Sequence, residues 1–274
     1  NTMTTERIAN HILETLTSQK TVLKACYEAS KDEIGYFFID NVLPEELALK
    51  CHEVFPKPQD MRMLKSIREY KYVSAQMDKH DNLLEQVIYA FQDERIVQLV
   101  SEICGIKQLE PDEFLYAGGI SLMKNGNFLN PHLDNSHDAK RERWRVLNLL
   151  YYVTPDWNLQ DGGHLELWPE GPKKNPLLLE SKFNRLIVMA THSASWHSVN
   201  KVEADRGRCC ISNYYFSKTP LRETDKFHVT KFRGRPNQTF VNIVLDGDAA
   251  LRMGIRKLFK KGIRENPHVY KKKS

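Results

Sequence analysis

The chain has 274 residues, of which 41% are hydrophobic and 27% are charged, a composition typical of globular proteins. It excludes wholesale disorder, collagen-like repeats and coiled-coil arrays, and no stretch approaches the roughly 18 apolar residues of a membrane-spanning helix. The formal net charge is +5, but residues 246–274 hold nine Lys and Arg against three Asp and Glu, so the rest of the chain is not a nucleic-acid-binding surface by composition.

The N-terminus and the cysteines indicate a reducing environment. Residues 1–16 lack the basic region followed by an apolar region that a secretory signal needs. The five cysteines are odd in number and include no CxxC pair, which argues against a disulfide framework or a zinc knuckle. On a strand, Cys209 and Cys210 would point to opposite faces and be buried as small hydrophobic residues. We therefore expect a cytoplasmic protein.

The first part of the chain, up to about residue 110, is predicted to be mostly helical. Apolar residues recur at helical spacing in residues 8–16, and Pro44 followed by two glutamates is typical of another helix start. Residues 84–104 also carry apolar residues at helical spacing, and Gly105 follows where a helix C-cap is expected. Between these helices, residues 34–40 (IGYFFID) are predicted to form a strand.

From residue 114 to 245 the pattern changes to short strands separated by Gly, Pro, Asn and Asp, which is typical of an all-β barrel or sandwich. The predicted strands are FLYAGGISLM, RVLNLLYYV, GGHLELW, NRLIVMA, SWHSV, GRCCISNYYFS, FHVTKF and TFVNIVL. A final helix is predicted for about residues 248–261, with Gly262 as its C-cap. We expect one catalytic unit, residues 1–274, consisting of a largely helical N-terminal support (1–110), a β core (111–245) and a basic amphipathic helical tail (246–274).

The segment PHLDN places a histidine and an aspartate two residues apart. On an extended strand His132 and Asp134 point to the same face, where an imidazole and a carboxylate can supply two adjacent ligands to a divalent metal. His197, in SWHSV, would complete a 2-His-1-carboxylate set, which leaves positions open on Fe(II) for a chelating cosubstrate and O₂. A surface His–Asp hydrogen bond and a structural histidine are the alternative explanations.

Arg208 and Ser212 lie four residues apart on the strand after His197 and share one face. An inward-pointing guanidinium in an apolar barrel needs an anion, and its planar fork matches a carboxylate. Pairing with a structural acid is the alternative. Arg206 lies two residues before Arg208 and would share its strand face, so it is an alternative anion-binding arginine, although it lies nearer the turn at Gly207.

The strand 145–153 carries two polar residues on one face, Asn148 and Tyr152, which indicates a lined pocket rather than a dry core. Gly162-Gly163 follows and fits a turn that enters the next strand.

In this order, the segments PHLDN, RVLNLLYYVTPDW, DGGHLELWPEG, FNRLIVMATHSASWHSV and GRCCISNYYF resemble the iron(II)- and 2-oxoglutarate-dependent dioxygenases, most closely the prolyl-4-hydroxylase-like branch. The likeness covers roughly residues 114–217. It implies a double-stranded β-helix (jelly-roll) core. The expected fold is therefore mainly β with flanking helices, its core buttressed by N-terminal helices and followed by a basic C-terminal helix.

The resemblance also implies roles for particular residues. The positions that match the family's iron ligands are His132, Asp134 and His197. Those that match the binding site for the distal carboxylate of 2-oxoglutarate are Arg208, Tyr152 and Ser212, with Asn148 beside the cosubstrate. The carboxylate at 134 favours hydroxylation, because halogenating relatives carry a small residue there. Near relatives often have a tyrosine on the preceding strand, where this chain has Leu122 or Met123, so that contact has to come from elsewhere.

The expected activity is hydroxylation of an unactivated C–H bond in a peptidyl (prolyl-like) or small-molecule substrate, with decarboxylation of 2-oxoglutarate to succinate. The expected cofactors are Fe(II), 2-oxoglutarate and O₂, with ascorbate as a reductant. Two alternatives stay open: a hydroxylase of a lipid- or carrier-linked glycan at a membrane surface, and a metal-dependent cupin-like enzyme that does not use 2-oxoglutarate. A peptide, a protein or a small molecule is the expected partner, nucleic acid is not, and the sequence does not predict the oligomeric state.

Two further segments bear on the substrate. The predicted helix within residues 246–274 has an apolar stripe among basic residues, a pattern that contacts an anionic membrane or acidic partner, or else packs on the barrel. The charged loop 136–144 is a candidate to close over the site. The aromatic candidates for the pocket rim, or for packing, are Trp157, His192 and Trp196.

Overall fold

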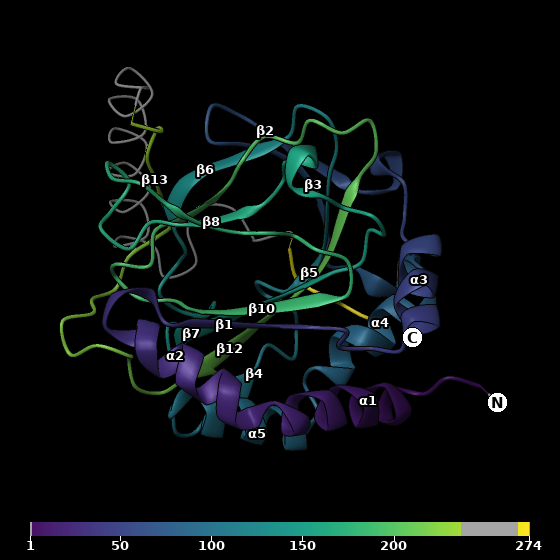
Figure 1. Cartoon of the computed structure of the whole chain (residues 1–274), viewed down its shortest axis with the longest axis horizontal. Helices are drawn as coiled ribbons and strands as arrows, with labels where there is room; N and C mark the ends of the chain where they lie inside the picture. Colours follow the sequence, from purple (N-terminus) through teal and green to yellow (C-terminus); the bar gives the residue numbers. More distant parts are fainter. Residues whose placement is uncertain (1, 237–267, 274) are drawn as a thin grey trace.

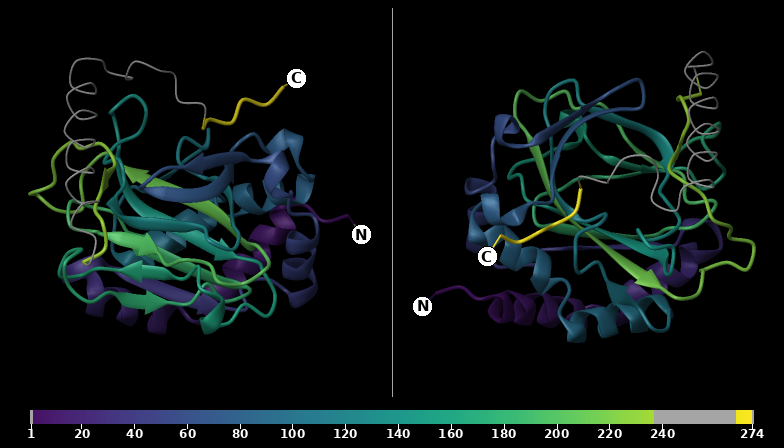
Figure 2. Two further views of the ribbon diagram at one scale, coloured as in Figure 1. Left: turned by 90° about the horizontal axis from the view of Figure 1, so that it is seen from above. Right: turned by 180° about the vertical axis from the view of Figure 1, so that it is seen from behind.

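The computed structural model describes residues 2–236 and 268–273. The strands form one antiparallel sheet that curls over on itself, and helices from the N-terminal part of the chain cover one outer side of it (Figures 1 and 2). This is the jelly-roll, or double-stranded β-helix, architecture that the sequence predicts.

The α-helices that the structure describes lie in the first 104 residues. They are α1 (Thr5–Ser18), α2 (Lys20–Ile34), α3 (Glu45–Glu53), α4 (Asn82–Ala90) and α5 (Glu94–Cys104), with 3-10 turns η1 (Pro58–Asp60), η2 (Met77–Lys79) and η3 (Leu159–Asp161). Helix α1 begins at Thr4, whose hydroxyl accepts a hydrogen bond from the Arg7 amide at 3.2 Å. Helix α5 ends at Gly105, whose φ of +66° lies in the left-handed region that favours glycine.

The apolar run at 84–104 forms two helices rather than one. The carboxylate of Asp93 accepts a hydrogen bond from the Arg95 amide at 2.9 Å and so caps a new helix, α5. Helix α4 contacts α1 and strand β12, whereas α5 packs mainly against α1 and α2.

Within residues 2–236 and 268–273 the sheet contains thirteen strands. They are β1 (Tyr36–Asp40), β2 (Arg62–Lys65), β3 (Glu69–Ser74), β4 (Glu110–Pro111), β5 (Gly119–Met123), β6 (Phe128–Leu133), β7 (Trp144–Tyr152), β8 (Leu165–Leu167), β9 (Leu177–Leu179), β10 (Arg185–Ala190), β11 (His197–Val199), β12 (Arg208–Ser217) and β13 (Lys231–Phe232). The hydrogen-bonded order is β1-β10-β7-β12-β5-β3-β6-β11-β8-β9, with β2 on β3, β4 on β12 and β13 on β6. Strands close in sequence, such as β6 and β7, are therefore separated in the sheet.

Strands β2 and β3 were not anticipated from the sequence. They form a hairpin, and β3 lies between β5 and β6, so residues of the first third of the chain belong to the sheet. The predicted strand TFVNIVL and the predicted helix at 248–261 lie outside the described residues. The division of the chain into a support, a core and a tail stays a prediction.

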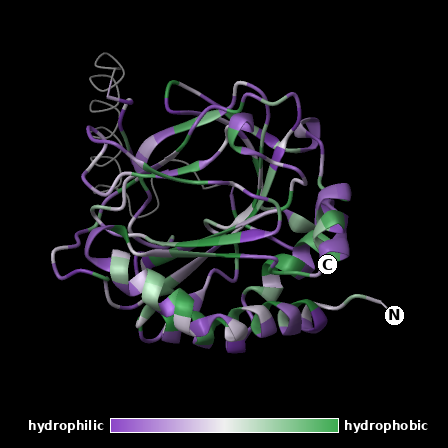
Figure 3. Cartoon of the chain, viewed as in Figure 1, coloured by the Kyte–Doolittle hydropathy of each residue, from purple (hydrophilic) through white to green (hydrophobic). Residues whose placement is uncertain are grey.

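The two faces of the sheet have different neighbours. Tyr151 faces outward into the hydrophobic core shared with α1, α4 and α5, whereas Tyr152 faces the interior of the curl. Cys209 likewise faces the outer hydrophobic core and Cys210 the interior of the curl. Both are buried and neither forms a disulfide, which confirms their expected role as small hydrophobic residues. Figure 3 shows hydrophobic and hydrophilic residues alternating along the helices, as one buried face per helix requires.

The helices that the structure describes include none that is both long and apolar enough to cross a bilayer.

Candidate active site

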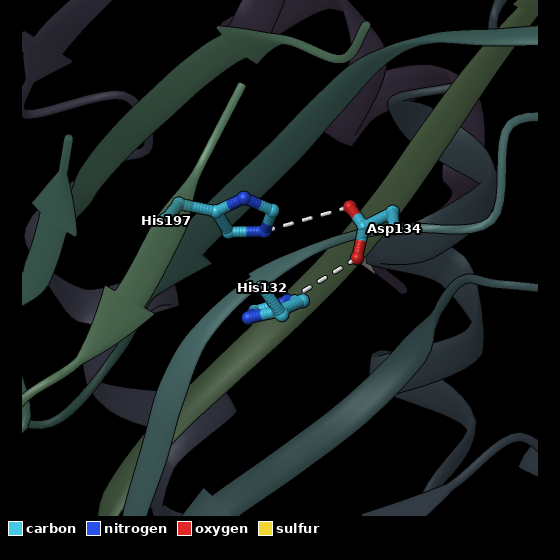
Figure 4. A group of neighbouring side chains, drawn as sticks. All are labelled: His132, Asp134 and His197. Atoms are coloured by element: carbon cyan, nitrogen blue, oxygen red, sulfur yellow. Dashed lines mark ion pairs between the residues drawn. The ribbon is translucent and has the colours of Figure 1, made fainter. Parts of the chain in front are cut away.

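Two histidines face each other across neighbouring strands. His132 on β6 is the register partner of His197 on β11, and their ring centroids are 4.1 Å apart. Asp134 follows directly after β6 and points between the two rings (Figure 4). Its carboxylate lies 3.3 Å from Nε2 of His132 and 3.5 Å from Nε2 of His197. The three side chains offer ligand atoms that all lie within 4.8 Å of one another.

Backbone carbonyls fix the orientation of both imidazoles. Nδ1 of His132 lies 3.0 Å from the carbonyl oxygen of Asn130, and Nδ1 of His197 lies 2.8 Å from that of Ser195. Since a carbonyl only accepts hydrogen bonds, each Nδ1 carries the proton and each Nε2 presents a lone pair toward Asp134. A backbone hydrogen bond of this kind is typical of histidines that bind a metal through Nε2.

The electrostatics favour a neutral imidazole beside an ionised carboxylate. Burial would raise the pKa of Asp134, but His197, His132 and Arg145 outweigh it and hold that pKa well below its usual range. Burial lowers the pKa of His197 to about 4, helped by His132 and opposed by Asp134. At neutral pH His197 therefore presents a nitrogen donor beside an ionised carboxylate, and with the imidazole of His132 the cluster forms the donor set that suits Fe(II).

A cavity of about 130 Å³ extends from this cluster into the curl of the sheet. We call it the inner cavity. The residues of β7 and β12 that line it are Asn148, Leu150, Tyr152, Arg208, Ser212 and Tyr214. Their positions follow from the two-residue period of a strand, and the inward direction predicted for Asn148, Tyr152, Arg208 and Ser212 is thus confirmed.

The side chain of Arg208 is buried at this cavity, and only some of its hydrogen-bond donors have partners. One terminal nitrogen donates to the carbonyl of Gly163 at 3.1 Å, and the guanidinium lies over the ring of Tyr152 at 5.3 Å. Nε has no hydrogen-bond partner, and within residues 2–236 and 268–273 no carboxylate pairs with Arg208. An unpaired buried guanidinium is costly, so this arrangement fits a site for the carboxylate of a ligand.

Neighbouring polar groups complete the same wall. Burial raises the pKa of Tyr152, so its hydroxyl stays protonated and able to donate a hydrogen bond. Oδ1 of Asn148 is buried without a partner. The hydroxyl of Ser212 lies 3.7 Å from Sγ of Cys210 and also lines the cavity. The structure therefore brings together all seven residues that the sequence singled out.

Arg206 lies elsewhere. Its side chain is 42% exposed, pairs with Asp161 at 3.3 Å and donates to the carbonyls of Pro155 and Asp156. It also stacks over the ring of Trp157. Arg208 rather than Arg206 therefore faces the inner cavity.

The three aromatic candidates for the pocket rim lie in different places. Trp157 is buried and donates from Nε1 to the carbonyl of Gly162 at 2.8 Å, as a packing residue does. His192, in the loop between β10 and β11, lines a small pocket that also includes Asp134. Trp196 is half-buried and lines neither that pocket nor the inner cavity.

Several functional neighbours were missed by sequence reasoning. The hydroxyl of Tyr214 lies 3.3 Å from the carboxylate of Asp134, and the alternation along β12 after Arg208 and Ser212 was a signal for it. His268 also lines the inner cavity, and its Nε2 lies 2.6 Å from the carbonyl oxygen of Gly118. No local pattern pointed to His268, because 150 residues separate it from Gly118 along the chain.

Comparisons with known proteins agree with this site. Residues 118–216 match the sequence profile of the 2OG-Fe(II) oxygenase superfamily. No curated protein sequence gives a significant match to the chain.

Solved structures of prolyl hydroxylases share the fold. The prolyl 4-hydroxylase of Phytophthora capsici has a TM-score of 0.55 at 17% identity, covering 96% of this chain and 82% of that one. The enzyme from Pseudomonas putida has a TM-score of 0.51 at 17% identity, covering 72% and 99%. A Trichoplax adhaerens prolyl hydroxylase, solved with a peptide fragment of hypoxia inducible factor, has a TM-score of 0.50 at 18% identity, covering 74% and 92%.

The profile match spans β5 to β12 and includes all three residues of the cluster in Figure 4 as well as Arg208. The likeness to solved structures, at these identities, concerns the fold. Residues 118–216 thus match the 2OG-Fe(II) oxygenase superfamily and contain the His-Asp-His cluster, which together indicate a 2-oxoglutarate-dependent non-haem iron oxygenase that uses Fe(II) and 2-oxoglutarate.

Proposed function

We propose that this oxygenase hydroxylates an unactivated C–H bond of its substrate while 2-oxoglutarate is decarboxylated to succinate. The observation that carries the proposal is a single cavity with His132, Asp134 and His197 at one end and the unpaired guanidinium of Arg208 in its wall. When bound, Fe(II) and 2-oxoglutarate supply the oxidising chemistry, and the protein supplies binding, orientation and exclusion of water.

In this proposal His132, Asp134 and His197 hold the iron. The Asn130 and Ser195 carbonyls keep both Nε2 lone pairs directed at the metal site. Tyr214 donates to the carboxylate of Asp134 and so restrains the one oxygen ligand. Three protein ligands leave room for a chelating cosubstrate and O₂.

Arg208 would hold the distal carboxylate of 2-oxoglutarate, with hydroxyl hydrogen bonds from Tyr152 and Ser212. All three line the inner cavity, and Arg208 and Tyr152 are almost wholly buried, so a charge-assisted hydrogen bond there competes little with water. Asn148 offers an unpartnered Oδ1 beside them, which supports its role next to the cosubstrate.

The carboxylate at position 134 supports hydroxylation over halogenation, because a halide would need the space that Asp134 fills. The shared fold with prolyl 4-hydroxylases supports a prolyl-like residue of a peptide as substrate, with a small molecule as the second candidate. A cupin-like activity without 2-oxoglutarate would leave Arg208 without a ligand. The glycan alternative depends on residues 246–274, most of which lie outside the described residues.

The test is an anaerobic titration of the full chain with Fe(II), with and without 2-oxoglutarate. A weak visible charge-transfer band that needs both components, and that His132→Ala abolishes while His11→Ala on α1 retains it, is the expected result. Succinate release in a substrate screen would follow. A band that forms without 2-oxoglutarate, or no band at all, would contradict the proposal.

A further inference from the structure

A second cavity, of about 340 Å³, adjoins the iron-ligand cluster. We call it the outer cleft. It shares His132, Asp134 and Tyr214 with the inner cavity but does not include Arg208 or Tyr152. It is therefore the part of the site that 2-oxoglutarate, as proposed, does not fill, and a substrate placed there lies next to the iron ligands.

The outer cleft is lined by more positive than negative charge. Its cationic side chains are Arg62, Arg68, Lys71 and Arg145, and its acids are Glu69 and Asp134. Asp134 belongs to the iron-ligand set, and Glu69 lies 3.9 Å from the ammonium of Lys71. The other cationic side chains of the described lining are arginines, and a cleft with low-dielectric walls concentrates the field of such charges.

Arg145 is the innermost of these cations. It lies on β7 and is only 8% exposed. Its guanidinium stacks over Tyr214 at 4.5 Å and Tyr116 at 6.0 Å, which fixes its plane at the wall of the cleft.

No acid satisfies this guanidinium. Nε of Arg145 is buried without a hydrogen-bond partner, and among the described residues its side chain forms no ion pair. The field of Arg145 reaches Asp134, but the oxygens of that carboxylate are engaged by His132, His197 and Tyr214. A buried arginine in this state is stabilised by an anion from outside the chain.

We propose that the outer cleft binds an oxyanion, a carboxylate or a phosphate, carried by the substrate, with Arg145 as its principal ligand and Lys71 and Arg68 nearer the mouth. The inference rests on the proposed function, since it concerns the substrate of the same reaction. The two buried arginines then have separate tasks, Arg208 holding the cosubstrate and Arg145 the substrate. The class of substrate that fits is an acid whose anionic group determines which C–H bond lies beside the iron.

The test uses the full chain loaded with Mn(II) and saturated with 2-oxoglutarate, so that the inner cavity is occupied. Inorganic phosphate and ¹³C-labelled acetate are added separately, and the paramagnetic enhancement of their ³¹P and ¹³C relaxation is measured. We expect saturable enhancement of at least one probe, which places it near the metal. The probe that binds more tightly shows whether the anion is a phosphate or a carboxylate.

Substitution of Arg145 makes the assignment specific. Arg145→Met should weaken binding of the probe about tenfold or more, Arg145→Lys should weaken it less, and Arg95→Met on α5 should leave it unchanged. Lys71→Gln combined with Arg68→Gln should weaken binding of the anion probe roughly two- to threefold. If Arg145→Met fails to bind Mn(II), this double variant tests whether the outer cleft binds the anion.

Three results would overturn the inference: no enhancement with either anion, enhancement that 2-oxoglutarate displaces, or binding that neither the Arg145 variants nor the Lys71 and Arg68 variant changes. None of these three results changes the charge-transfer band expected for the complex with iron and 2-oxoglutarate, which tests the proposed function separately. Loss of that band would instead remove the proposed function.

Discussion

The carbonyl of Gly163 accepts a hydrogen bond from the guanidinium of Arg208 at 3.1 Å, and the same glycine leaves the room that Arg208 occupies. A Cβ at position 163 would come within 3.2 Å of Cδ of Arg208 and 2.9 Å of the Val202 side chain. The backbone there has a φ of +67°. The turn at Gly162-Gly163 therefore positions the arginine as well as starting a strand.

Gly163→Ala should displace Arg208. We expect the apparent affinity for 2-oxoglutarate to fall about tenfold, because the hydrogen bonds of a charged group are lost or bent, while Fe(II) binding persists. Titration of the charge-transfer band with 2-oxoglutarate measures this. Gly105→Ala is the matched control, since Gly105 has a φ of +66° and nothing within 4 Å of its Cβ position. The control should lose about 1 kcal/mol of stability and keep its affinity.

Arg208→Ala should weaken 2-oxoglutarate binding about a hundredfold, because a buried carboxylate would lose its guanidinium partner in the inner cavity. Mn(II) binding, followed by electron paramagnetic resonance, should change little. Arg206→Ala removes a neighbouring arginine that pairs with Asp161 at the surface, and its 2-oxoglutarate affinity should match that of the unmodified chain. Equal affinities for the two variants would refute the assignment of the carboxylate site.

Protonation of His192 should destabilise the fold in mild acid. Burial lowers the pKa of His192 to about 4, helped by Arg222 and opposed by Asp225. Because the folded-state pKa lies below the unfolded value of 6.5, the unfolded chain binds the proton more readily, and stability falls as pH drops from 6.5 toward 4. The loss attributable to this side chain is about 3 kcal/mol.

Urea unfolding across this pH range measures the effect. His192→Asn keeps an acceptor for the Ala194 amide, which donates to Nδ1 of His192 at 3.1 Å, and removes the titrating group. Its stability should depend less steeply on pH than that of His11→Asn. An unchanged slope would show that other groups carry the pH dependence.

Residues 268–273 form a strap that is held in place by Tyr270. The Tyr270 amide donates to the carbonyl of Phe114 at 2.9 Å, and its hydroxyl donates to the carboxylate of Glu85 at 3.1 Å. Tyr270→Ala should cost about 3 kcal/mol of unfolding free energy and expose the amides of the strap to hydrogen exchange. Tyr270→Phe loses only the hydroxyl contact and should cost about 1 kcal/mol with the strap still protected. Equal protection in both variants would show that other contacts suffice.

Local periodicity explains why much of this site was predictable. His132 and Asp134 share a face because a strand repeats every two residues, and the same rule placed Arg208 and Ser212 together. Gly105 ended a helix as its conformational freedom suggests. The resemblance to a known family then assigned residues from separate strands to one site, which periodicity alone could not do.

Other features depended on contacts that no local rule describes. The hairpin of β2 and β3 was missed because its exposed strand β2, RMLK, does not alternate apolar and polar residues and buries no face of its own. Arg145 was expected only as the first residue of the strand 145–153, and the structure shows its buried guanidinium against the rings of Tyr116 and Tyr214. A side chain's partners, unlike its direction, are set by the whole fold.

The contact between His268 and Gly118 also has a consequence for synthesis. The iron ligands are complete once His197 has been made, but this wall of the pocket is added only about seventy residues later, with His268. At ribosomal rates of roughly 5–20 residues per second, the interval is on the order of ten seconds or less. A chain that has not yet placed His268 therefore lacks one wall of the inner cavity although its three iron-ligand residues are already present.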